Sequence, residues 1–242
     1  IKLSSESAAP ENSEVKQFYP NMRYPSSSIS FSVESSCNVQ KRQDVERALD
    51  IIQNKTILKF YEKMNGTEIK FSCSDAVPAA KTAKHFVAGE GGPVTIINTS
   101  KYSIILQGQV LLYRIERCGE PVVTIHETLH ALGFDHTSHE SSILYPVSNC
   151  NQQLEQEIVN IINQIYAVKS LPDITIESLN ANRRGLFISF EIIIANEGLS
   201  EIGDAALILK SEGKKIKDIP LESLEIGKKR IITVENLRIP WG

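Results

Sequence analysis

Residues 126–146, HETLHALGFDHTSHESSILYP, contain four of the five histidines of the chain. Residues four apart on a helix lie on one face, so His126 and His130 can hold one metal ion together. Gly133 is the residue type that ends helices and permits a sharp reversal, which allows His136 to return as a third ligand. Three neutral imidazoles with an open fourth position are typical of a catalytic zinc site, because structural zinc sites are closed.

Glu127 follows the first histidine, so its carboxylate can reach a water molecule on that ion. Zinc lowers the pKa of its water from about 15.7 to about 7 and polarises a carbonyl group. Glu127 would take the proton of the water and pass it to the leaving amine. The predicted function is therefore a zinc-dependent endopeptidase that hydrolyses peptide bonds with a zinc-bound water activated by Glu127. A helix face with coincidental histidines is the structural alternative.

The extended pattern H-E-x-x-H-x-x-G-x-x-H, which begins at His126, resembles the metzincin clan of zinc endopeptidases, and within it the matrixins. Residues 131–136, ALGFDH, are similar to the end of the matrixin active-site helix. Residues 142–146, SILYP, stand at the matrixin distance for the Met-turn, with Leu144 in place of the methionine. The resemblance is specific over residues 126–146 and agrees in element order over about residues 29–167.

The resemblance implies one catalytic Zn²⁺ ion, a protein or peptide substrate and an apolar floor at Leu144 beneath the metal. It also implies that Tyr145, Pro146 and Val147 form the wall of the pocket for the substrate residue after the scissile bond. An edge strand ahead of the active helix is expected to pair with extended substrate, and residues 102–106, YSIIL, are the predicted candidate. The calcium and structural-zinc loops of the family are not seen, so a structural calcium ion is left open.

Two other groups could take part in metal binding. Residues 117–121, RCGEP, mimic the matrixin cysteine switch, but Cys118 would lie about 12 Å or more along the helix axis from His126. A disulfide or buried thiol is therefore the predicted role of Cys118. His139 follows His136 by three residues and could replace it, although a loop histidine near the cleft rim is favoured. His85 is the one histidine outside the stretch.

The chain has four cysteines without C-x-x-C spacing, which suits two disulfides in an oxidising compartment. We predict a Cys37–Cys73 bridge, because each of these residues ends a strand-like run on either side of one helix. That pairing leaves Cys118 and Cys150 for the second bridge, and four free thiols remain the alternative. An extracellular or cell-surface location is expected.

The order of elements predicts an α/β (α+β) domain with a mixed sheet over residues 29–168, and the resemblance to the metzincins implies that this domain is zincin-like and catalytic. A flexible lead-in is expected over residues 1–28, which contain few apolar positions. The predicted elements are strands at 29–33 and 68–73, helices at 43–64 and 152–167, three β runs (VTIIN, YSIIL and QVLLYRI), and the active helix between Pro121 and Gly133.

Residues 171–242 alternate short β runs with turn signals, which predicts an antiparallel β-sandwich. This part has no histidine or cysteine, so the chemistry is expected in the first domain. Residues 172–176, 195–198 and 221–227 resemble the Ig-like CARDB or APHP-type adhesion modules of extracellular archaeal and bacterial enzymes. That resemblance implies a module that positions the catalytic domain or attaches it to a cell surface or envelope.

The formal net charge of −3 gives no indication of a nucleic-acid partner. No apolar run reaches the ~18 residues that a membrane-spanning helix needs. The sequence begins with Ile1, so a processed fragment is expected, with any signal peptide or membrane anchor outside it. Two alternatives to the endopeptidase are a non-catalytic secreted adhesion or binding protein that retains a zinc site, and a zinc hydrolase for a non-peptide amide.

Overall fold

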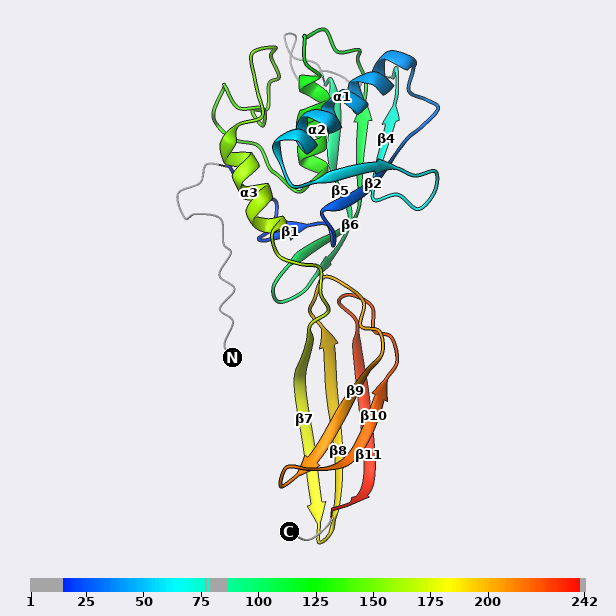
Figure 1. Ribbon diagram of the computed structural model, residues 1–242. Coiled ribbons are helices and arrows are strands. Elements are labelled where there is room, and N and C mark those ends of the chain that lie inside the picture. Colours follow the sequence, from blue (N-terminus) through cyan, green and yellow to red (C-terminus); the bar gives the residue numbers. More distant parts are fainter. Residues whose placement is uncertain (1–14, 77, 79–86, 240–242) are drawn as a thin grey trace. The chain divides into compact units, whose positions relative to one another are not determined.

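The computed structural model describes residues 15–76, 78 and 87–239, which form two compact units (Figure 1). The first unit comprises residues up to 97 and residues 102–169, and the second comprises residues 98–101 and the chain from residue 170 onward. None of the helices in the described ranges is long and apolar enough to cross a membrane.

The first unit is built on a six-stranded sheet with the strand order β1-β6-β4-β2-β3, and β5 pairs with β6. The four pairings along that order are all parallel. Only residues 99–102 separate β5 from β6, which is too short for a parallel crossover, so β5 runs antiparallel. The sheet is therefore mixed, as predicted. Its strands are β1 (Met22–Arg23), β2 (Ser28–Val33), β3 (Lys59–Glu62), β4 (Ile69–Cys73), β5 (Gly89–Asn98) and β6 (Ser103–Leu112).

The prediction that YSIIL is the substrate-pairing edge strand is wrong. Residues 103–106 belong to β6, which pairs with β5, β1 and β4 and is an interior strand. The predicted runs YSIIL and QVLLYRI are largely one strand. Among the described strands β5 pairs only with β6, and it contains Pro93, which an edge strand tolerates because proline has no N–H to donate. β5 is thus an edge strand, and its Gly89 and Gly91 approach Glu127 of the active helix.

The first helix, α1 (Val39–Lys55), ends earlier than the predicted 43–64. Its N-cap Asn38 accepts a hydrogen bond from the backbone N–H of Lys41, and its C-cap Thr56 is in an extended conformation. Thr56 donates from both its N–H and its hydroxyl to the carbonyl of Ile52. The apolar residues beyond Thr56 continue the helical spacing, but residues 59–62 form β3 beside β2.

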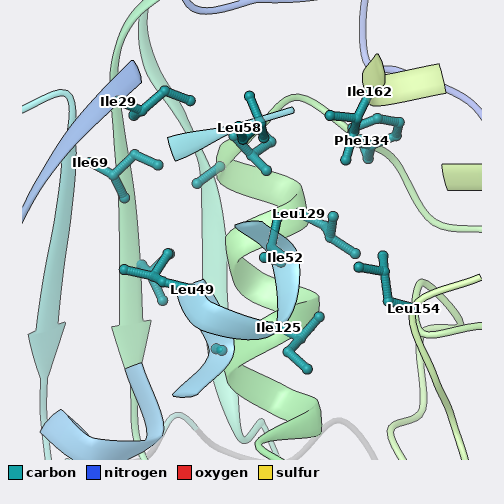
Figure 2. Packing of buried hydrophobic residues seen from close by; sticks show 14 of the residues in the cluster. Ile29, Leu49, Ile52, Leu58, Ile69, Ile125, Leu129, Phe134, Leu154 and Ile162 are labelled. Carbon is teal, nitrogen blue, oxygen red and sulfur yellow. The ribbon is translucent and has the colours of Figure 1, made fainter. Parts of the chain in front are cut away.

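Two further helices complete the core of the first unit. They are α2 (Val122–Ala131), which begins after Pro121 as predicted, and α3 (Gln156–Tyr166), which is shorter than the predicted 152–167. Figure 2 shows Ile52 of α1 together with Ile125 and Leu129 of α2 in this core. The active helix is therefore held by apolar packing against α1 on one side of its axis.

Residues 15–28 differ from the predicted flexible lead-in. Met22, Arg23 and Tyr24 are fully or almost fully buried. The Arg23 guanidinium donates to the carbonyl of Ile165 at 2.6 Å and lies 4.6 Å from the ring centroid of Tyr166. The buried residues of this segment are few, and a count of its composition does not reveal that they pack into the core. Residues 1–14 lie outside the described part.

Both predicted disulfides are present, Cys37–Cys73 and Cys118–Cys150. The first joins the chain just before α1 to the end of β4, and the second joins the segment before α2 to the segment before α3. Two disulfides in a chain of this size are typical of an oxidising compartment.

The second unit contains five antiparallel strands in two sheets, with orders β11-β8-β7 and β10-β9. Apolar side chains from both sheets form one cluster, which includes Phe190, Ile192 and Leu221. The antiparallel β organisation predicted for this part is confirmed. The strands are β7 (Ile174–Arg184), β8 (Phe187–Asn196), β9 (Ala205–Ser211), β10 (Lys214–Leu221) and β11 (Lys229–Arg238).

Candidate metal centre

Three imidazole rings meet at one point beside α2. The Nε2 atom of His130 lies 2.9 Å from that of His126 and 3.1 Å from that of His136, and the His126 and His136 Nε2 atoms are 3.3 Å apart. Helix α2 supplies the first two rings. The chain then reverses at Gly133, whose φ of 97° is in the left-handed region, and returns His136 to the same point.

The far nitrogens of two of these rings are held by backbone carbonyls. His126 Nδ1 lies 2.6 Å from the carbonyl oxygen of Ile143, and His130 Nδ1 lies 2.7 Å from that of Phe134. A carbonyl oxygen can only accept, so each Nδ1 carries the proton in the neutral ring. The Nε2 atoms of His126 and His130 are then unprotonated, and their lone pairs point to the shared centre.

This donor set fits a zinc ion. Two nitrogens about 2.05 Å from one tetrahedral zinc lie about 3.3 Å apart, which is close to the three separations observed. Lone pairs facing one another at such distances repel unless a cation lies between them. Burial lowers the pKa of His126 to about 3 and also lowers the pKa values of His130 and His136, so the rings are neutral, as metal ligands must be.

Glu127 lies next to the histidine cluster and is buried. Burial, together with the smaller effect of the Glu90 charge, raises the pKa of its carboxyl group to about 8, although a hydrogen bond from the Gly91 N–H acts in the opposite direction. A dication at the histidines would also favour the ionised form. The site therefore places a carboxyl group with a strongly perturbed pKa beside the metal ligands, which is typical of an acid–base catalyst.

Strand β5 approaches α2 at Glu127 through glycines. A Cβ at Gly91 would lie 2.1 Å from the backbone carbonyl oxygen of Glu127, and a Cβ at Gly89 would lie 2.7 Å from its Cγ. Residues 89–92, GEGG, precede the predicted β run VTIIN and lie outside the strands predicted from the sequence. Glycines within a strand mark a close approach of two backbones, so the repeated glycines were the signal that could have found this contact.

The turn after the third histidine packs tightly against the cluster. Leu144 is fully buried, its N–H donates to the Ser142 hydroxyl oxygen at 3.1 Å, and its carbonyl accepts from Thr137 at 3.1 Å. Tyr145 is half-buried, whereas Pro146 and Val147 are exposed. The turn therefore buries the apolar side chain of Leu144 and leaves Pro146 and Val147 at the surface.

The remaining candidate residues are not among the three histidines that converge. The only metal-ligand cluster among the described residues is His126, His130 and His136, which does not include His139. Cys118 is bonded to Cys150, so it offers no thiol for a cysteine switch. Asp135 accepts a hydrogen bond from the backbone N–H of His136 and so orients the chain at the ligand. His85 lies outside the described residues.

Comparison with known proteins points to the same region. Residues 116–167 match the family model of the matrixins. The matched segment contains α2, the three histidines, Glu127, the turn at Leu144 and α3. It covers about a fifth of the chain, and no curated protein matches. A matrixin family match over a histidine cluster indicates a zinc metalloprotease.

Proposed function

We propose that the protein is a zinc-dependent endopeptidase with a matrixin-like catalytic domain over about residues 29–168. The observation that carries this proposal is the convergence of three Nε2 atoms on one point beside the buried Glu127, within the segment that matches the matrixins. His126, His130 and His136 would hold one Zn²⁺ ion.

The chemistry divides between the ion and the protein. A bound zinc ion would act as a Lewis acid that activates water and polarises the substrate carbonyl. Glu127 accepts a proton from the attacking water and returns it to the leaving nitrogen. The Ile143 and Phe134 carbonyls keep the rings of His126 and His130 in the orientation and tautomer that the ligands need.

Substrate is bound in extended form along β5, which replaces YSIIL as the proposed pairing strand because it is an edge strand that contacts α2 at Glu127. Tyr145, Pro146 and Val147 form the wall of the pocket for the residue after the scissile bond. Leu144 forms the apolar floor beneath the metal in place of a methionine. No step of the proposed reaction needs a calcium ion.

The second unit, from about residue 171, is proposed to be an Ig-like β-sandwich similar to the CARDB and APHP modules. Two sheets that share one apolar cluster support this assignment. The unit would position the catalytic domain at a cell surface or envelope, and the two disulfides support an extracellular location.

The test compares zinc-loaded wild type with Glu127→Ala on unfolded protein substrates and a peptide library. The variant is expected to keep one zinc ion per chain and to lose at least about 100-fold in cleavage rate. Full cleavage by Glu127→Ala would overturn the mechanism. A wild type that binds one zinc ion but cleaves none of these substrates would favour the adhesion protein that retains a zinc site, and cleavage of non-peptide amides alone would indicate the other hydrolase.

A further inference from the structure

A pocket of about 390 Å³ lies beside the candidate metal centre and takes no part in the chemistry described above. None of its lining residues is charged. The Phe18 ring centroid is 5.9 Å from that of the metal ligand His130, so the pocket and the centre are neighbours. The lining residues are Phe18, Tyr19, Met22, Gly92, Pro93 and Ile96.

The segment that carries Phe18 and Tyr19 has a fixed backbone. Phe18 donates from its N–H to the carbonyl of Gly133, and the Gln17 side chain bonds both the N–H and the carbonyl of Met22. Phe18 and Tyr19 are nevertheless 38% and 50% exposed. Large aromatic side chains that a rigid backbone holds at the surface are suited to binding, because little conformational entropy is lost when a ligand covers them.

The pocket and the turn that leads into the proposed substrate wall contact different histidines of the centre. The turn that leads into this wall contacts His126 through Ile143, whereas Phe18 contacts His130 one helical turn further along α2. If the wall takes the residue after the scissile bond, the residues before that bond extend toward Phe18.

Strand β5 connects the two places. It contacts Glu127 at Gly89 and Gly91 and lines the pocket from Gly92 to Ile96. The middle of the pocket-lining stretch is three residues from Gly91, or about 10 Å at ~3.3 Å per residue. A peptide extended along β5 would therefore bring a side chain to the pocket two or three residues before the scissile bond.

We propose that this pocket selects a large apolar side chain, aromatic or aliphatic, two or three residues before the scissile bond, and that Phe18 and Tyr19 determine this preference. The inference rests on the proposed endopeptidase function. An apolar pocket of this kind discriminates a large from a small side chain by about tenfold or more in kcat/KM.

The first experiment uses peptides that carry Phe, Leu, Ala or Asp at each of the three positions before a common cleavage site. When the varied residue is the second or the third before the cleavage site, zinc-loaded wild type should cleave the Phe and Leu peptides about tenfold faster than the Ala peptide at one of these two positions. The Asp peptide should be cleaved most slowly. The Phe18→Ala/Tyr19→Ala variant should reduce the Phe-to-Ala ratio to below about threefold. Tyr61→Ala, which removes a similarly exposed tyrosine from β3, should leave that ratio unchanged.

A second measurement separates this inference from the proposed function. The zinc-loaded Glu127→Ala protein is titrated with the same peptides, and their dissociation constants are read by fluorescence anisotropy.

If wild type cleaves nothing, the endopeptidase proposal fails, and the ratios of the dissociation constants alone decide whether the pocket prefers large apolar side chains. If wild type cleaves the peptides without preference at these positions, or the preference survives the double substitution, the pocket inference fails while the function stands. If the double variant loses zinc or unfolds, the single variant Tyr19→Ala is used instead, because the Tyr19 side chain is more exposed. A lower Phe-to-Ala ratio in that variant would then support the pocket inference, and an unchanged ratio would contradict it.

Discussion

His126 donates from Nδ1 to the carbonyl oxygen of Ile143, and this 2.6 Å contact ties the first histidine of the cluster to the turn that contains Leu144. The turn is itself braced by Ser142, whose hydroxyl donates to the Glu155 carboxylate at 2.9 Å and accepts from the Leu144 N–H. The orientation of a ligand on α2 therefore depends on side chains at the start of α3.

Ser142→Ala should weaken zinc binding by about tenfold, because groups that orient metal ligands typically contribute 10- to 100-fold to metal affinity. Isothermal titration of the metal-free protein with zinc measures the change. Ser141→Ala is the matched control, since the neighbouring serine is exposed. Equal affinities for the two variants would contradict a role for the braced turn.

Leu144→Met should leave zinc affinity and cleavage nearly unchanged and should cost less than about 1.5 kcal/mol in the free energy of unfolding, because the two side chains are close in volume. Leu144→Ala should cost about 2 to 5 kcal/mol, since Leu144 is fully buried. Urea unfolding and a cleavage assay give both quantities. A large gain of activity in Leu144→Met would mean that the turn needs a sulfur atom and that the leucine marks a weakened site.

Gly91→Ala should displace β5 from α2, because the added Cβ would lie 2.1 Å from the Glu127 carbonyl oxygen. We expect a loss of about 2 to 3 kcal/mol in the free energy of unfolding. Gly92→Ala should change stability by less than about 0.5 kcal/mol, since nothing lies within 4 Å of a Cβ there. Thermal and urea unfolding of the two neighbouring variants measure this difference, and similar stabilities would refute the close approach of the two backbones.

His136→Ala should lower zinc affinity by more than about 100-fold, since loss of a ligand costs more than loss of a supporting contact. His139→Ala should bind zinc as wild type does, because His139 is not part of the cluster. Zinc at 100 times its dissociation constant should stabilise wild type by about 2.7 kcal/mol, and a chelator should remove that gain. If His139→Ala loses zinc and His136→Ala keeps it, the third ligand has been assigned to the wrong histidine.

The metal-free protein should show a pH dependence that comes from Glu127. Burial raises the pKa of this carboxyl group from 4.5 to about 8, so the folded protein binds the proton more tightly than the unfolded chain. The stability contributed by the protonated group is complete below pH 4.5 and is lost as the pH rises through about 8. Glu127→Gln is neutral throughout, so its advantage over wild type in urea unfolding should grow between pH 5 and pH 8. A difference that stays constant over that range would show that the carboxyl group is not perturbed.

The convergence of the three histidines could be predicted from the sequence because they are close along the chain. Two histidines four apart and a glycine-assisted reversal define the site within eleven residues, because residues four apart on a helix lie on the same face. The Cys37–Cys73 pairing could be predicted because each cysteine ends a strand-like run and one helix separates the two runs, so the two strands were expected to be neighbours.

Features that depend on contacts distant in the sequence could not be predicted. The helical spacing of apolar residues continues past Thr56, and only the pairing of residues 59–62 with β2 ends the helix there. The alternation of apolar residues does not separate interior from edge strands, and only Pro93 and the glycines of β5 indicate that β5, and not β6, lies at the edge. The packing of residues 15–28 depends on α2 and α3, more than 100 residues away, as the bond from Tyr24 to Ala131 shows.

The Cys118–Cys150 bridge closes a covalent ring around the proposed catalytic apparatus. All three histidines, Glu127 and Leu144 lie between the two cysteines. A single proteolytic cut within an exposed loop of the ring would leave both fragments attached to each other. The ligands from α2 and the ligand after Gly133 would stay tethered, so a nicked molecule could retain its metal and survive damage that would take apart an open chain.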